Sequence, residues 1–124
     1  MKKKILIIDD SLDILEMTRS ILQTRGYDIL TLSDGSRVLE TVRTQRPDLI
    51  VIDMLLPDKN GDQLCSEIKS EENLSHIPII ITTGQAIVEE SSQEIPGMFR
   101  PDDYLSKPFE VDDLLGKIQD LLNK

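Results

Sequence analysis

The chain has 124 residues, of which 30% are charged and 39% hydrophobic, and both the length and these amounts suit one globular domain. The formal net charge of −9 repels nucleic acid and anionic lipid, so we expect no direct nucleic-acid partner and no membrane partner. No apolar run reaches membrane-spanning length, and the single Cys65 cannot form an internal disulfide, so we expect a cytoplasmic protein.

The predicted elements alternate between strand and helix along the chain. Continuous apolar, β-branched runs indicate strands that are covered on both faces, as in a parallel sheet. Weaker runs indicate two further strands at 27–32 and 102–106. In chain order we expect a strand at 4–9, a helix from a Ser11 cap to Gly26, a strand at 27–32, a helix at 34–45, a strand at 48–53, a helix at 61–71, strands at 77–82 and 102–106, and a helix at 111–122.

The helical segments are predicted from apolar periodicity and from their ends. Arg46 precedes a proline and should leave the helical region, whereas Pro96 and Gly97 leave room only for a short or mobile helix within 84–101. The first helix should bury one face that carries Ile14, Met17, Thr18, Ile21 and Leu22.

This alternation predicts the α/β class, with a single doubly wound parallel sheet and helices on both faces. No internal repeat, linker or low-complexity segment divides the chain. We therefore expect one domain over 1–124, with no output domain in this chain.

Polar side chains follow several of the predicted strands. Asp9 and Asp10 follow the first, Asp53 ends the third, Thr83 follows the fourth, and Lys107 follows the last. Ligands of open α/β sheets bind outside the carboxyl ends of the strands. If the first and third strands are neighbours, the three aspartates converge there.

Three carboxylates at close range repel one another, and a divalent cation relieves that repulsion. Oxygen ligands in an incomplete cage suit Mg²⁺, or Mn²⁺ in its place. The metal and Lys107 would make a positive pocket around Asp53, whose carboxylate could attack a phosphoryl group. The Thr83 hydroxyl could hydrogen-bond a phosphoryl oxygen.

With these residues in place, the chain resembles the receiver domain of two-component response regulators over essentially its whole length. The resemblance rests on Asp9-Asp10, on "DMLLPDKNG" (53–61) with Pro57 and Gly61, on Thr83-Gly84, and on "DDYLSKPF" (102–109). It implies a five-stranded, flavodoxin-like sheet in the order 2-1-3-4-5, which is the strand order of the family.

The resemblance also implies a role for each site residue. Asp53 would accept a phosphoryl group from the phosphohistidine of a sensor histidine kinase or phosphotransfer protein. Asp10, Asp53 and the Leu55 backbone carbonyl would ligate Mg²⁺, with Asp9 helping directly or through water. Lys107 would contact the phosphoryl group.

Further roles implied by the resemblance concern switching. Thr83 would bond the phosphoryl group and move inward, and Tyr104 would follow as the aromatic switch. Leu55 and Gln85 would tune how long the phosphoryl bond lasts, and the Lys107-Pro108 bond would be cis. The module would catalyse only its own phosphotransfer and autodephosphorylation, and its downstream target is unknown.

Two features depart from the family pattern. Arg100-Pro101 stands where Gly-Ala is common, and Pro96-Gly97 interrupts the usual fourth helix. The chemistry is therefore expected to be intact, while the family's rules for the output surface should not be carried over to this chain.

Three alternatives remain beside this interpretation. A degenerate receiver would act only as a docking module. An Asp-nucleophile phosphohydrolase would need a second acid two residues after the nucleophile, where this chain has Leu55. A nucleotide or flavin binder would need a phosphate-binding loop after the first strand, where this chain has "DDSLD".

Overall fold

The computed structural model describes residues 2–84 and 100–123. Their strands form one parallel sheet in the order β2-β1-β3-β4-β5. This confirms the predicted fold class and strand order. The elements in chain order are β1 (Lys4–Ile8), α1 (Leu12–Thr24), β2 (Asp28–Leu32), α2 (Val38–Gln45), β3 (Leu49–Asp53), α3 (Gly61–Lys69), β4 (Ile79–Thr83), β5 (Asp103–Ser106) and α4 (Val111–Leu122).

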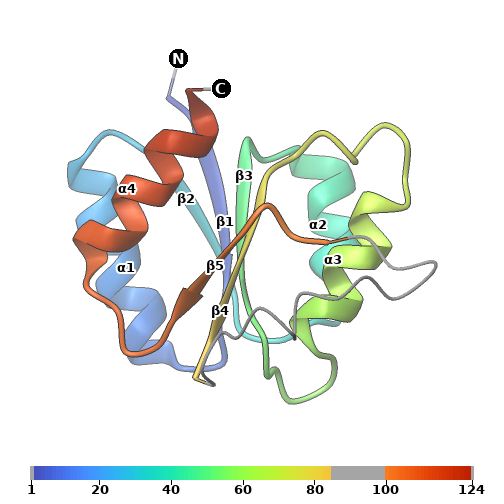
Figure 1. The fold of residues 1–124 in the computed structure, drawn as a ribbon, viewed down its shortest axis with the longest axis horizontal. Coiled ribbons are helices and arrows are strands. Elements are labelled where there is room, and N and C mark those ends of the chain that lie inside the picture. The colour runs from blue at the N-terminus through green and yellow to red at the C-terminus, as the bar shows by residue number, and fades with distance from the viewer. Residues whose placement is uncertain (1, 85–99, 124) are drawn as a thin grey trace.

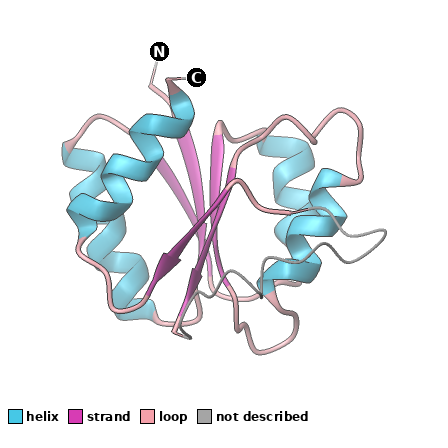
Figure 2. Ribbon diagram, viewed as in Figure 1, coloured by secondary structure: helices cyan, strands magenta, loops and turns pink. Residues whose placement is uncertain are grey.

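The helices cover both faces of the sheet (Figure 1). Helices α1 and α4 pack on one face, and α2 and α3 pack on the other, which gives the three layers that Figure 2 shows. Successive strand residues point to opposite faces, so Ile5 and Ile7 of β1 pack in the α1–α4 layer while Leu6 and Ile8 pack in the α2–α3 layer. Two apolar layers explain why the central strands carry apolar residues at successive positions.

Helix α1 buries a stripe that overlaps only in part with the predicted one, since Thr18 and Leu22 belong to both. Its buried residues are Leu15, Thr18 and Leu22, whereas Met17 is 45% exposed. Residues at i, i+3 and i+7 lie on one face of a helix, and Leu15 completes that set around Thr18. The prediction that Met17 points inward was wrong because Met17 lies about 100° around the helix from Thr18.

Helix α2 begins at Val38, four residues later than predicted. The Asp34 carboxylate accepts hydrogen bonds from the Ser36 N–H at 2.9 Å and from the Ser36 hydroxyl at 2.6 Å. Such local side-chain bonds stabilise a turn in competition with a helix. At the other end of α2, Arg46 leaves the helical region with φ of 46°, as predicted.

Strand β4 begins at Ile79 and extends to Thr83, so it lies slightly later than the predicted 77–82. Pro78 has no N–H to give to a neighbouring strand, and the Ile77 N–H bonds the Leu74 carbonyl instead. Thr83 remains in the strand because it pairs with Ser106 of β5. The predicted helix within 84–101 lies almost entirely outside the described residues.

None of the helices in the described part of the chain is long and apolar enough to cross a membrane. The single Cys65 is fully buried on α3, and burial raises the pKa of its thiol to about 12. It therefore behaves as a small core residue.

Candidate functional site

The carboxyl ends of β1 and β3 bring three aspartates together. The two strands pair in parallel with Ile8 opposite Ile52, so the residues that follow, Asp9 and Asp53, emerge beside each other. Carboxylate oxygens of Asp9, Asp10 and Asp53 all lie within 4.8 Å of one another. The predicted convergence is therefore present, at the point where the strand order reverses.

Two of the three carboxylates are removed from solvent. Asp9 is 3% and Asp53 is 6% exposed, whereas Asp10 lies at the exposed rim. Ionised carboxylates are rarely buried unless they are paired. The buried pair therefore needs cations close by.

Lys107 supplies one cation from the end of β5. Its Nζ lies 2.8 Å from Asp9 Oδ2 and 3.3 Å from Asp53 Oδ2. The Lys107 N–H also donates to the Thr83 carbonyl at 2.7 Å, and the Lys107-Pro108 bond is cis, as the resemblance implied. Lys107 is thus joined both to the Asp53 carboxylate and to the end of β4.

The cluster sets one lysine against three carboxylates, and burial together with these charges shifts the pKa of Asp53 and that of Lys107. Burial, and then the charge of Asp9, raise the pKa of Asp53, although Lys107 and the Leu55 backbone N–H oppose the change. Burial works to lower the pKa of Lys107, but its contacts with Asp9 and Asp53 outweigh burial and raise it. The cluster holds an excess of negative charge, and oxygen donors at this spacing fit a divalent cation.

Asp9 is held at both of its oxygens. Oδ1 accepts the Ser11 N–H at 2.9 Å, and Oδ2 accepts from Lys107. Sequence reasoning treated Ser11 only as the helix cap, a role it also has because its hydroxyl accepts the Ile14 N–H at 3.3 Å. The signal for the missed contact was the position of Ser11 two residues after an aspartate, where Asx turns form.

The chain after Asp53 is fixed by backbone contacts. The Met54 N–H donates to the Thr82 carbonyl, and the Gly61 N–H donates to the Met54 carbonyl, both at 2.8 Å. A β-carbon on Gly61 would lie 2.8 Å from the Asp53 carbonyl oxygen, so only glycine fits there. The Leu55 side chain is 63% exposed, and its main chain lies beside the Asp53 carboxylate.

Thr83 and Tyr104 lie close to each other on neighbouring strands. Thr83 ends β4 and is buried, and Tyr104 of β5 stands opposite Ile81. Thr83 and Ile81 share one face of β4, the face on which Tyr104 packs partly buried against the α2–α3 layer. Gln85 lies outside the described residues, so its predicted tuning role stays a prediction.

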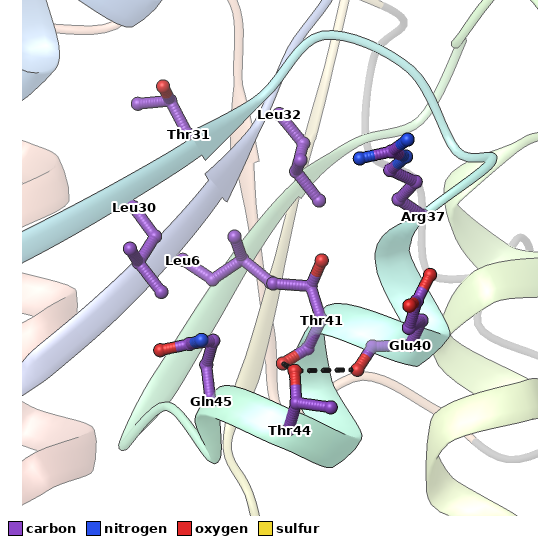
Figure 3. Close-up of a pocket in the computed structure, with 9 residues that line it drawn as sticks. All are labelled: Leu6, Leu30, Thr31, Leu32, Arg37, Glu40, Thr41, Thr44 and Gln45. Atoms are coloured by element: carbon purple, nitrogen blue, oxygen red, sulfur yellow. Dashed lines mark hydrogen bonds between the residues drawn. The ribbon is translucent and has the colours of Figure 1, made fainter.

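Two of the hollows that the described residues form are relevant to where the phosphoryl chemistry lies. One, of about 520 Å³, adjoins the lysine–aspartate cluster and is lined by Asp10, Leu12, Ser33, Asp34, Ser36, Pro57 and Asp58. The other, of about 290 Å³, lies between α2 and β2 over Leu6, Leu30 and Leu32 (Figure 3). The second contains none of the predicted site residues, so we do not assign the phosphoryl chemistry to it.

Comparison with known proteins gives one consistent result. A family profile described as "Response regulator receiver domain" matches residues 5–119. The alkaline phosphatase synthesis transcriptional regulatory protein PhoP of Bacillus subtilis is 32% identical over 100% of this chain and 50% of its own length. The chain thus spans about half the length of this curated relative. Since the relative is named a transcriptional regulatory protein, the comparison does not support our expectation that nucleic acid is not a partner.

Solved structures agree with the family profile. A CheY-like response regulator receiver domain protein from Methanospirillum hungatei has a TM-score of 0.87 and 30% identity, covering 99% of this chain and 95% of its own. The receiver domain of a sensor histidine kinase from Pseudomonas aeruginosa has a TM-score of 0.86 and 27% identity, covering 100% of both chains. That second structure is described with a magnesium ion coordinated in the active site cleft.

Proposed function

Because the chain belongs to the response regulator receiver domain family, whose members are signalling modules and not classical enzymes, we propose that it is switched by phosphorylation of Asp53. The observation that carries the proposal is the placement of one buried carboxylate between an acidic rim and Lys107. Such a carboxylate is available as a nucleophile when the surrounding charge is neutralised.

The phosphodonor would be a phosphohistidine on a sensor histidine kinase or phosphotransfer protein. An oxygen of the Asp53 carboxylate attacks phosphorus and forms the new P–O bond. The P–N bond to histidine breaks, and its electron pair returns to the imidazole ring, which takes up a proton. The products are an acyl phosphate on this chain and a neutral histidine on the donor.

The proposed metal site consists of Asp10, Asp53 and the Leu55 backbone carbonyl. When bound there, Mg²⁺ would neutralise charge on the transferring phosphoryl oxygens. The roles that we propose for Asp9 and Lys107 follow from their contacts with each other and with Asp53. Asp9 holds Lys107 at 2.8 Å, and Lys107 faces the Asp53 oxygen that lies 3.3 Å away. These contacts support the proposal that the lysine binds the incoming phosphoryl group.

The proposed switch lies at the ends of β4 and β5. A phosphoryl group on Asp53 adds a dianion that competes for Lys107 and attracts the Thr83 hydroxyl. The Lys107 N–H already bonds the Thr83 carbonyl, so the two residues would respond together. We propose that Tyr104 follows Thr83 and that the 84–107 region thereby changes the binding of a downstream partner.

Labelling by a small-molecule phosphodonor tests the proposal. The wild-type chain should gain the mass of one phosphoryl group from acetyl phosphate with Mg²⁺, and no such mass with EDTA. Asp53→Asn should not be labelled, while Asp62→Asn, which alters a half-buried acid on α3, should label like wild type. Labelling of the Asp53→Asn chain would refute the assignment, and absence of labelling in the wild-type chain would refute the phosphorylation switch.

A further inference from the structure

The connection between β2 and α2 is tied to the loop that follows Asp53. The Gly35 N–H donates to Asp58 Oδ1 at 2.8 Å across 23 residues of sequence. A β-carbon on Gly35 would lie 3.2 Å from Lys59 Cβ and 3.3 Å from Asp58 Oδ1 and Leu64 Cδ1. The backbone of the connection therefore packs tightly against the tip of the loop.

The loop at residues 54–61 is a closed turn that connects the Gly35–Asp58 hydrogen bond to the site. Its base is joined by Gly61 N–H to the Met54 carbonyl at 2.8 Å, its middle by an antiparallel bridge between Leu55 and Asn60, and its tip by Leu56 N–H to the Lys59 carbonyl at 3.2 Å. Asp58 lies at the tip, three residues after Leu55. These hydrogen bonds connect the tip that carries Asp58 to the main chain of Leu55.

We infer that Asp58 is a positioning residue that holds the Leu55 main chain against the carboxylate cluster and so sets the affinity of that cluster for a divalent cation. The inference rests on the proposed metal site. Outer contacts that orient metal ligands commonly change affinity by about 10- to 100-fold when removed. Because Asp58 acts through a turn and not through a ligand side chain, we expect an effect at the low end of that range.

The charge of Asp58 must be separated from its hydrogen bond. Asp58 lines the same hollow as Asp10 and Asp34, so its carboxylate could also attract a cation through space. Asp34 provides the matched control, because among the described residues its carboxylate accepts hydrogen bonds from Ser36 of its own turn. Asp34→Asn removes the same charge from the same hollow and keeps an oxygen acceptor for Ser36. Asp58→Asn removes the charge and keeps an oxygen acceptor for Gly35.

The test is calorimetric titration of each full chain with Mg²⁺ alone. We expect Asp58→Ala to bind about tenfold more weakly than wild type, and Asp58→Asn and Asp34→Asn to bind close to wild type. In the metal-free protein, amide hydrogen exchange at Gly35 should be fast in Asp58→Ala and protected in the other three chains. If Asp58→Ala does not fold, Gly35→Ala replaces it, because its new methyl group displaces the same tip from the other side.

Three outcomes would overturn the inference. Equal affinities of Asp58→Ala and Asp34→Asn for Mg²⁺ would show that the hydrogen bond between Asp58 and Gly35 does not matter. Equal weakening in Asp58→Asn and Asp58→Ala would assign the effect to charge. A wild-type chain that binds no Mg²⁺ would overturn the proposed metal site as well, and the wild-type titration distinguishes that failure from the other two.

Discussion

Asp53→Asn should raise the free energy of unfolding of the metal-free protein. The substitution removes a charge from a side chain that is nearly buried and lies among other acids, while it preserves the shape of the carboxylate. A neutral amide avoids the desolvation that an ionised carboxylate suffers on burial. The variant that abolishes function is therefore expected to be more stable than the wild type.

The magnitude follows from the distances. At an effective dielectric constant of about 20, a second charge at the 4.8 Å limit of the cluster repels Asp53 by about 3.5 kcal/mol. Lys107 at 3.3 Å attracts it by about 5 kcal/mol, and the repulsion from exposed Asp10 is weaker because water screens it. These contributions nearly offset one another, so the desolvation of Asp53 decides the sign. We expect a gain of about 1–2 kcal/mol.

The gain should depend on pH. Burial and then Asp9 raise the pKa of Asp53 above its ordinary value of 3.8. The native chain therefore keeps the proton to higher pH than the unfolded chain, and wild-type stability falls as pH rises from 3.8 through the raised pKa. Below 3.8, Asp53 is protonated in both states, and the difference between wild type and Asp53→Asn should shrink.

Urea denaturation with EDTA, at neutral pH and at successively lower pH, measures this difference. Asp62→Asn is the comparison for desolvation without neighbouring acids, because burial alone raises the pKa of Asp62, and it should change the free energy of unfolding in the same direction. Saturating Mg²⁺ should stabilise the wild type and should stabilise Asp53→Asn much less. A metal-free Asp53→Asn chain that is no more stable than the wild type at neutral pH would refute the argument from desolvation.

Three further substitutions test the packing and charges around the site, each by the urea midpoint in EDTA. Lys107→Met should lower the free energy of unfolding by about 2–3 kcal/mol, because it leaves Asp9 and Asp53 without the cation that lies 2.8 and 3.3 Å from them; an unchanged midpoint would mean that the pair is not coupled to the lysine. Gly61→Ala should cost about 2 kcal/mol, since its β-carbon would meet the Asp53 carbonyl oxygen at 2.8 Å, and wild-type stability would contradict that contact. Thr18→Val should add about 1 kcal/mol, because the buried Thr18 hydroxyl finds no hydrogen-bond partner in the part of the chain that the structure describes; a loss of stability would indicate a partner.

The positions of Asp9 and Asp53 could be predicted from local sequence because each aspartate follows or ends an apolar strand. Asp53 closes an apolar run that can only be a buried strand, so its carboxylate had to emerge at the carboxyl edge of the sheet. Asp9 follows by the same reasoning from β1. Lys107 was also expected at this edge from its place after the last strand, but only the structure shows its 2.8 Å contact with Asp9.

The features that sequence reasoning missed depend on contacts between loops. The hydrogen bond between Gly35 and Asp58 spans 23 residues and leaves no periodic signal. The late start of α2 depends on whether the Asp34 side chain bonds its own turn or yields to the helix. The exposure of Met17 shows the same limit for packing, because several apolar residues of α1 could have formed the buried stripe.

The most direct test of the proposed function is to locate the phosphoryl group. The wild-type chain is incubated with acetyl phosphate and Mg²⁺ and then fragmented for mass spectrometry under conditions that preserve acyl phosphates. The account predicts that the added mass lies on Asp53. A phosphoryl group on any other residue, or none on a chain that binds Mg²⁺, would contradict it.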